Sequence, residues 1–531
     1  MTATIQILLL LLAVLVAVAI LARRLNVAPS ILLVIAGIGL AFIPGLPSIE
    51  LAPELVLLVI LPPLLYSAAV AMSWREFRFN LRPIFLLAFG AVVFTTCAVA
   101  VAAHYVIGLP WAVGFLLGAI VSPPDAVAPL AVARRLRLPR RLLLVLEGEG
   151  VANDATALIL YRFAVVAVST GTFAFGEAAG AFAAIVVGEI IWGIAVGWLS
   201  LRLRRWVRDP RVEITLSVMT PYIAYWVPEH LGGSGVLATV AAGLYVSWRG
   251  PLLIPSATRL QGIFFWDLII YLIEGFVFLV VGLQARTLLG RIEAYSLRDL
   301  AVAVALVTII VIVARFVWVF PAVYLPRWLN PSLARRDPSP PWEQAFVLAF
   351  VGVRGVVSLA AALAIPFLTA GGEVFPHRDL ILFVTFGVIV VTLVGQGLML
   401  PAVIRWLGLA KDAKVERVNE LEAELAARQD AIEAAHRRME ELLASREIPA
   451  EVAELLRQRH DHRRRQLVGD ELRETVAELK LDLLQVEREF LFQLLREGRI
   501  TDEARRRLER ELDLEEAAII SRRGEESVLP L

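Results

Sequence analysis

The stretch VLEGEGVANDATAL, residues 145–158, places three carboxylates in a segment that is otherwise apolar. They are Glu147, Glu149 and Asp154, and Asn153 directly precedes the last of them. An aspartate at the centre of a membrane helix costs about 2.5–3.5 kcal/mol even on lenient insertion scales. The stretch therefore requires a fold that turns these acids toward protein or water, and acids held in this way are functional by default.

The rest of the chain has the composition of a membrane protein. Of its 531 residues, 58% are hydrophobic, and the mean hydropathy is +0.73. The apolar residues form blocks near the length of about 20 residues that crosses a bilayer as a helix. The first block, residues 5–22, lacks the basic start and cleavage site of a signal peptide, so we expect a retained membrane helix. The single cysteine, Cys97, excludes an internal disulfide, and a net charge of +1 indicates no nucleic-acid partner.

Charged residues divide the chain into two domains. Residues 411–531 hold 53 of the 101 Asp, Glu, Lys and Arg side chains, and residues 1–410 hold the other 48. We therefore predict a transmembrane domain over residues 1–410. Apolar residues at helical spacing predict a charged, helical domain over residues 411–531.

Within the first domain, the hydropathy predicts an all-α fold of about thirteen membrane helices. Their approximate ranges are 5–22, 30–46, 52–72, 83–107, 111–133, 141–168, 176–201, 213–230, 234–249, 262–285, 299–325, 342–369 and 379–407. The odd-numbered loops hold twenty arginines and the even-numbered loops only four. Because positively charged loops stay in the cytoplasm, we expect the N-terminus outside, the tail inside, and the protein in the cell (inner) membrane.

Two of the predicted helices are interrupted where they carry charge. SPPDAVAP, residues 122–129, contains three prolines around Asp125, and GVRGVVS, residues 352–358, has glycines on both sides of Arg354. The depths of Asp125, Asp154 and Arg354 all fall in the middle third of the membrane. The two interrupted helices are seven crossings apart and so run in opposite directions. Ordinary proline kinks are one explanation, and the inverted repeats of a secondary transporter are the other.

Six stretches carry a family resemblance. They are LPPLLYSAAV (61–70), SPPDAVAP, EGEGVANDATALILYRFAV (147–165), FVFLVVGLQ (276–284), GVRGVVSLAAALAIP (352–366) and LVGQGLMLP (393–401). In this order they resemble the bacterial sodium/proton antiporters of the monovalent cation:proton antiporter-1 family, over about residues 5–410. The resemblance implies cation/proton exchange by alternating access and a homodimer.

The resemblance also implies roles for individual residues. Asn153 and Asp154 match the family's Asn-Asp pair, in which the aspartate is the principal ion ligand and the proton carrier. Asp125 matches the aspartate of the unwound fifth helix. Glu149 and Arg354 match a structural ion pair between helices six and twelve. Proteins of this family with Asn before the aspartate are taken to be electroneutral, so we predict one-for-one exchange.

This chain departs from the family pattern at three positions. Gly150 replaces a serine that often follows the acid at position 149, and Ser67 stands where many relatives carry an acid. The family's Thr-Asp-Pro is Pro124-Asp125-Ala126 here, so the carbonyl of Pro124 is kept and the threonine hydroxyl is lost. Ser122 is the candidate substitute for that hydroxyl.

The chemistry of these residues also indicates cation/proton exchange, independently of the resemblance. A hard cation such as Na⁺ prefers carboxylate, carbonyl and hydroxyl oxygens, and burial favours the protonated form of a carboxylate. If cation and proton compete for Asp125 and Asp154, one site that opens to each side in turn exchanges them. The ions expected at the site are Na⁺, or Li⁺ or K⁺, and H⁺, with no cofactor.

Other interpretations stay open at this point. A membrane enzyme would need catalytic groups at one surface, and a channel usually needs rings of identical groups, whereas the acids here meet at mid-depth. A K⁺/H⁺ antiporter, a channel-like protein and a sensory protein are the alternatives. Glu189 and Glu274 also look deep, and each either lines a water path or pairs with an arginine such as Arg162 or Arg315.

Overall fold

The computed structural model describes residues 2–44, 52–136, 138–171, 175–207, 209–292, 295–369, 371–445, 449–465, 471–497, 499 and 502–526. Apart from loops and one isolated β-bridge, the described residues are helical, which confirms the predicted all-α fold. The chain divides into two compact units, Met1–Ala413 and Lys414–Leu531.

Seven helices in the described part of the first unit are long and apolar enough to cross a bilayer. Five are continuous: α1 (Thr2–Leu25), α9 (Arg140–Thr170), α10 (Phe175–Arg204), α13 (Ser256–Gly290) and α14 (Leu297–Leu329). Two contain π-helical turns: Leu81–Ile107, with α5 (Leu81–Phe85) and α6 (Val92–Ala102), and Arg378–Trp406, with α18 (Arg378–Val390) and α19 (Gly397–Trp406). Large apolar side chains on these helices, including Leu9, Ile191 and Phe264, are exposed, as lipid contact requires.

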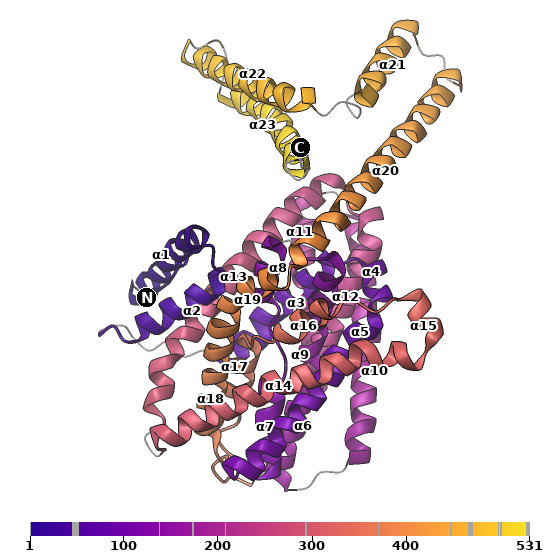
Figure 1. Ribbon diagram of the computed structural model, residues 1–531. Helices are drawn as coiled ribbons and strands as arrows, with labels where there is room; N and C mark the ends of the chain where they lie inside the picture. The colour runs from indigo at the N-terminus through magenta and orange to yellow at the C-terminus, as the bar shows by residue number, and fades with distance from the viewer. Residues whose placement is uncertain are drawn as a thin grey trace. The chain divides into compact units, whose positions relative to one another are not determined.

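Shorter helices complete this unit (Figure 1). They are α2 (Pro29–Ala41), α3 (Leu61–Ala71), α4 (Trp74–Phe79), α7 (Trp111–Val121), α8 (Val127–Arg135), α11 (Pro210–His230), α12 (Val236–Arg249), α15 (Pro331–Arg336), α16 (Trp342–Phe350) and α17 (Val356–Leu363). The predicted helix 30–46 stops at Ala41, and the predicted helices 111–133 and 342–369 are each split in two. The number of membrane crossings stays a prediction.

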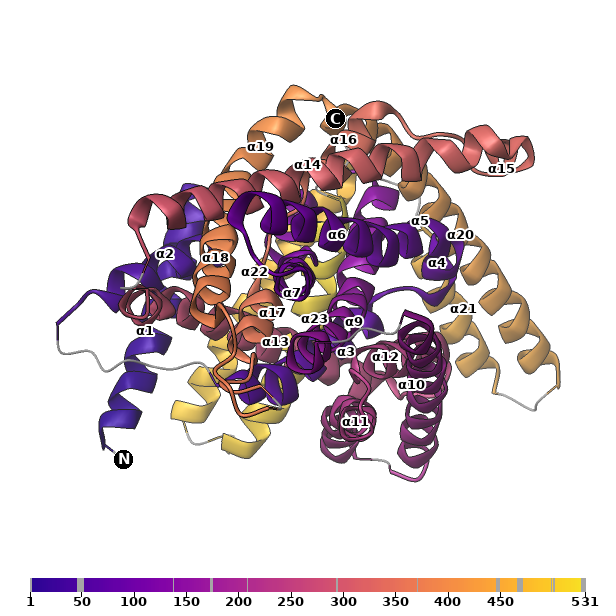
Figure 2. The same cartoon turned by 90° about the horizontal axis from the view of Figure 1, so that it is seen from below.

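The helices of the first unit pack as two bundles. In one, which we name the α13 bundle, α2 packs along α13, α10 along α12, and α11 against α3, α12 and α13. In the other, the α9 bundle, α7 packs against α6 and α9, while α14 packs against α6, α16 and α18. Figure 2 shows α10, α11 and α12 together on one side of α9, with α6, α14 and α18 on the other.

Small residues allow a close helix contact in the α13 bundle. At Gly282 of α13 an added Cβ would lie 2.3 Å from the carbonyl oxygen of Val34 and 2.8 Å from the Cα of Gly37, both on α2. Only glycine fits this crossing, which is the usual device for close packing of membrane helices. The two helices are therefore held at backbone contact.

Two helices of the α9 bundle are broken at the places that the sequence indicates. Helix α7 ends at Val121, and α8 begins at Val127 after five non-helical residues that include Pro123 and Pro124. Helix α16 ends at Phe350, and α17 begins only after the non-helical residues 351–355. Prolines explain the first break because they lack the amide donor and clash with the preceding turn.

The second unit contains helices only, within its described residues. They are α20 (Leu409–Ser445), which begins in the first unit, α21 (Ala450–Arg465), α22 (Glu471–Arg496) and α23 (Asp502–Glu526). Helices α22 and α23 pack together, and Arg488 of α22 forms ion pairs with Asp513, at 2.6 Å, and with Glu516 of α23.

Candidate functional site

The two helix breaks touch each other. The backbone amide of Asp125 donates a hydrogen bond to the carbonyl of Val353 at 2.7 Å. At Gly355 an added Cβ would lie only 1.7 Å from the Oδ2 atom of Asp125, so this approach needs glycine. The structure therefore brings the predicted breaks of residues 122–129 and 352–358 into one crossing.

Helix α9 is bonded to the same crossing through Asn153. This side chain is fully buried, and its amide nitrogen donates to the carbonyl of Pro124 at 2.7 Å. Its Oδ1 atom has no hydrogen-bond partner among the described residues. Buried polar atoms are normally satisfied, so this oxygen marks a place where a cation or a water would be bound.

The two aspartates are the partly exposed members of this cluster. Asp125 and Asp154 both retain some solvent exposure, and the charge of Asp125 acts on Asp154. Asp125 accepts a hydrogen bond from the amide of Val127 at 2.8 Å, at the start of α8. Asp154 makes no hydrogen bond or ion pair with the described residues. Its carboxylate is thus left for a proton or an ion.

The structure corrects the predicted partner of Glu149. Its two carboxylate oxygens accept hydrogen bonds from Nη1 and Nη2 of Arg315, on α14, at 2.5 and 2.8 Å. The side chains of Glu149 and Arg315 are 2% and 3% exposed, so this ion pair is sealed from water. The prediction that Arg354 forms this pair is wrong, because helix spacing fixes the face of α9 but not the helix that lies against it.

Arg354 instead binds the open ends of the broken helices. Its guanidinium donates to the carbonyls of Val121, at 2.7 Å, Ser122, at 3.3 Å, and Gly352. Its backbone amide donates to the hydroxyl of Thr392 at 3.0 Å. A helix that stops inside a bundle leaves carbonyls without intrahelical donors, and Arg354 supplies them.

The auxiliary candidates have structural partners. The hydroxyl of Ser122 is buried and donates to the carbonyl of Ala119 at 3.2 Å, whereas Pro124 uses its carbonyl for Asn153. Glu274 of α13 is partly exposed, and the charges of Asp125 and Arg134 act on it. Among these candidates, Glu274 is therefore the acid that interacts electrostatically with Asp125.

Glu189 has a role that neither predicted alternative covers. Its carboxylate accepts hydrogen bonds from the backbone amides of Ser234 (2.6 Å), Gly235 (3.1 Å) and Leu237 (3.1 Å). These amides open α12, where a carboxylate is favoured by the free donors and the helix dipole. Among the described residues, Glu189 is therefore bonded to a helix start and not to the predicted arginine, and the water path stays a prediction.

The sequence interpretation gave Arg315 no place in the site. The signal was present, since Arg315 is a single cation within the apolar run VIVARFVW, residues 311–318. A lone arginine in the middle of a membrane helix requires a buried partner. The sequence does not indicate which of the buried acids that partner is.

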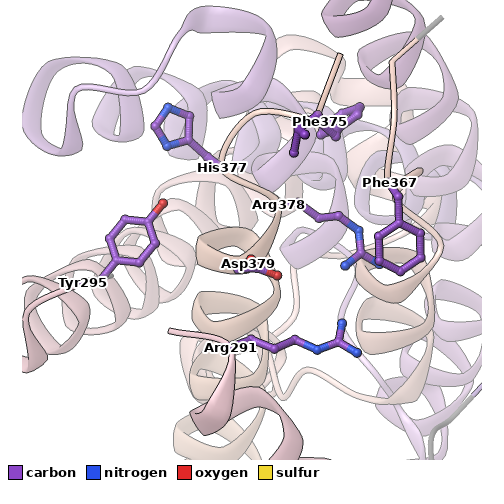
Figure 3. Close-up of a pocket in the computed structure, with 8 residues that line it drawn as sticks. Arg291, Tyr295, Phe367, Phe375, His377, Arg378 and Asp379 are labelled. Atoms are coloured by element: carbon purple, nitrogen blue, oxygen red, sulfur yellow. The ribbon is translucent and has the colours of Figure 1, made fainter. Parts of the chain in front are cut away.

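A cavity of about 400 Å³ lies away from this cluster (Figure 3). Arg291, Tyr295 and Arg378 help to line it, and the predicted site residues do not. The guanidinium of Arg378 donates to the carbonyls of Leu363 and Ile365 and lies 4.1 Å from the ring centre of Phe367. The cavity is thus bordered by an arginine that caps the end of α17.

Comparison with known proteins adds a family and a fold. The profile of the family described as "Sodium/hydrogen exchanger, transmembrane" matches residues 9–406. The chain is 35% identical to an uncharacterized Na(+)/H(+) exchanger of Mycobacterium tuberculosis, over 94% of this chain and 93% of the relative. It is 33% identical to a sodium, potassium, lithium and rubidium/H(+) antiporter of Bacillus pumilus, over 69% of this chain and 56% of the relative.

One further relative and one solved structure extend this comparison. The Na(+)/H(+) antiporter ApNhaP of Aphanothece halophytica is 32% identical, over 76% of this chain and 74% of its own. The structure of the sodium proton antiporter MjNhaP1 of Methanocaldococcus jannaschii aligns with a TM-score of 0.59 at 20% identity, over 77% of this chain and 99% of that one. The helical arrangement is therefore that of a known fold.

Proposed function

Because this chain belongs to the sodium/hydrogen exchanger family, we propose that it exchanges a monovalent cation, chiefly Na⁺, for protons across the membrane. The observation that carries the proposal is the contact between the two broken helices beside Asp125, Asn153 and Asp154. Irregular backbone at membrane depth offers carbonyls and helix ends to an ion that a continuous helix cannot offer.

Competition for Asp154 is the proposed basis of the exchange. A cation would take carboxylate oxygens from Asp125 and Asp154, with the unpartnered Oδ1 of Asn153 as a further ligand. A proton on Asp154 removes the charge that holds the cation, so the two ligands exclude each other. With Asp125 ionised throughout and Glu149 held by Arg315, one proton is exchanged for one cation. No step needs a cofactor or a catalytic reaction.

Membrane topology and assembly follow from the same proposal. The two broken segments support an inverted-repeat architecture of about thirteen crossings. The arginine-rich loops support an external N-terminus and a cytoplasmic tail in the cell (inner) membrane. The resemblance to homodimeric antiporters supports the proposal that this protein is also a homodimer.

The relatives differ in the cations for which they are named. The relative from Bacillus pumilus is named for four alkali cations, whereas that from Aphanothece halophytica is named for Na⁺ alone. At Gly150 an added Cβ would lie 2.6 Å from the Cβ of Ala126, so this backbone has no room for the serine hydroxyl found in relatives. Fewer hydroxyl ligands should weaken discrimination among the alkali cations. K⁺/H⁺ exchange is therefore the second candidate function.

The test is flux through the purified protein in proteoliposomes with an imposed pH gradient. Saturable proton movement driven by Na⁺ and able to run uphill is expected, and Asp154→Asn should abolish it. Comparing Na⁺, Li⁺ and K⁺ over a pH series decides between the two candidates. Passive cation flux that does not saturate and moves no protons would exclude a carrier.

A further inference from the structure

An ion pair joins the two bundles on the far side of Asp154. Arg162 of α9 donates through Nη2 to Oε1 of Glu229 on α11. Helix α9 belongs to the α9 bundle and α11 to the α13 bundle, and α12 and α3 of the second bundle also touch α9, so the pair lies at the border between the two bundles. The side chains are 32% and 22% exposed, which places the pair at the border of the packed interior.

The position of this pair along its helices is specific. Arg162 follows Asp154 by eight residues, or about 12 Å of helix, in the direction away from Arg140. Glu229 is the penultimate residue of α11, whose opposite end begins at Pro210. Both residues thus lie toward the ends of α9 and α11 that are remote from the arginine-rich loops.

The structure is closed between Asp154 and this pair. Residues 155–159 of α9 are all buried, and Ile159 is only 1% exposed. In the other direction, Gly150 and Glu147 of the same helix are partly exposed, as is Asp154 itself. The helix is therefore more tightly enclosed between Asp154 and Arg162 than between Asp154 and its beginning.

The end of α11 that carries Glu229 is held by contacts with neighbouring helices. One turn earlier on α11, Tyr225 is 2% exposed, and its backbone and ring contact Gly235 at the start of α12. The carboxylate of Glu189 holds that start through the amides of Ser234, Gly235 and Leu237. The end of α11 is thereby tied to α10 and α12, so Arg162 is attached to the α13 bundle as a body.

We propose that Arg162 and Glu229 form a lock that holds the carrier in the state closed on the side opposite the tail. The inference rests on the proposed function, because alternating access requires the two bundles to move against each other. Opening that side requires α9 to move away from α11, which breaks this pair. The two residues position the bundles and do not touch the transported ion.

The test is the labelling of a single cysteine from the face of the membrane opposite the tail. Cys97→Ser removes the native thiol, and Ile159→Cys reports on the sealed segment. A membrane-impermeant maleimide should label this protein slowly, and about fivefold faster once Glu229→Gln or Arg162→Gln breaks the pair, as for a partly exposed ion pair. The charge exchange Arg162→Glu with Glu229→Arg should restore slow labelling.

A matched control lies within one bundle. Arg134 and Glu147 also form an ion pair, at 2.7 Å, but both belong to elements that pack in the α9 bundle. Glu147→Gln should leave the labelling of Ile159→Cys unchanged. Equal labelling with and without Glu229→Gln, or a charge exchange that stays fast, would overturn the lock.

Transport in the same vesicles separates this inference from the proposed function. Glu229→Gln should lower the KM for the cation on the face opposite the tail, and raise it to a smaller extent on the tail face, because the populations of the two states shift. If Glu229→Gln speeds the labelling of Ile159→Cys but the protein shows no cation/proton exchange, the lock is supported and the proposed transport function is refuted. Exchange with labelling that does not respond would refute the lock alone.

Discussion

Glu149 of α9 and Arg315 of α14 form a doubly hydrogen-bonded ion pair inside the bundle, with both side chains almost fully buried. The pair neutralises Glu149 and joins two helices that are far apart in sequence. It also leaves Arg354 available to bind the carbonyls of the broken helices. Arg315 therefore pairs with Glu149, and Arg354 binds the helix ends, whereas the sequence had suggested Arg354 as the partner of Glu149.

Arg315→Met should strongly destabilise the protein. It leaves the charge of Glu149 buried without a partner, which costs about 3–5 kcal/mol of unfolding free energy. Denaturant unfolding in detergent measures the change. Glu149→Gln together with Arg315→Met should recover much of it, while Arg134→Met, at an exposed pair, should cost about 1 kcal/mol or less. Parental stability of Arg315→Met would show that the pair contributes nothing.

Asp154→Asn and Asp125→Asn should each abolish cation/proton exchange in a folded protein. Asparagine keeps the size of the side chain but can neither balance a cation nor release a proton. Exchange in proteoliposomes is the measurement, with size-exclusion profiles to show folding. Asp267→Asn is the control, since Asp267 is exposed and should not matter. Near-normal exchange by Asp154→Asn would remove the central assignment.

Gly355→Ala should abolish exchange by steric means alone. The new methyl group would collide with the carboxylate of Asp125 and push the two breaks apart. Gly395→Ala is a matched control, because nothing lies within 4 Å of a Cβ at that position. Normal exchange by Gly355→Ala would mean that the crossing of the breaks is not needed for transport.

An imposed membrane voltage should leave the exchange equilibrium unmoved. The proposed cycle trades one proton for one cation on Asp154, so no net charge crosses the membrane. Potassium and valinomycin can set the voltage at fixed Na⁺ and pH gradients in proteoliposomes. A reversal point that shifts with voltage would refute one-for-one exchange and would make Glu274 the first candidate for a second proton carrier.

Asp337 should make the stability of the protein depend on pH. Burial raises the pKa of Asp337, but Arg141 and Arg327 outweigh this and hold the pKa below its ordinary value. Its carboxylate also accepts a hydrogen bond from Arg82 at 2.9 Å. A lowered pKa means that the contribution is complete above the unfolded-state pKa of about 4 and is lost as the pH falls below it.

Asp337→Asn should therefore destabilise the protein by about 1–2 kcal/mol at pH 7, allowing for the partial exposure of Arg82 and Arg141. Unfolding measured at several pH values should show the difference from the parent shrinking as the pH falls below about 4. A difference that stays constant with pH would assign the effect to packing rather than to charge.

The sequence predicted the positions of the two helix breaks better than the contacts made there. Asp125 and Arg354 were found because proline and glycine interrupt apolar helices at charged positions, and both breaks are present. Depth in the membrane follows from counting residues along a helix. The neighbour across a helix does not, because several helices present a cation or an acid at the same depth. Arg315 was therefore missed as the partner of Glu149.

The partners of Glu189 also could not be predicted from the sequence. A carboxylate in an apolar helix suggests water or an arginine, yet its partners are the backbone amides at the start of α12. Helix ends carry their partial charges without any side chain that a sequence could display. Such partners appear only when the packing is known.

Arg354, which binds the broken helix ends, also affects how tightly cation movement is coupled to proton movement. Arg354 keeps its charge at any physiological pH, and the pair of Glu149 and Arg315 sums to zero. Counted over Arg354, Asp125 and Asp154, with both aspartates ionised, the proposed empty site has a net charge of −1, and either Na⁺ or H⁺ brings that sum to zero. Moving an uncompensated charge through the low-dielectric middle of the protein is costly. In the proposed cycle the unloaded carrier is thus the form least able to return, which would suppress cation or proton movement without exchange.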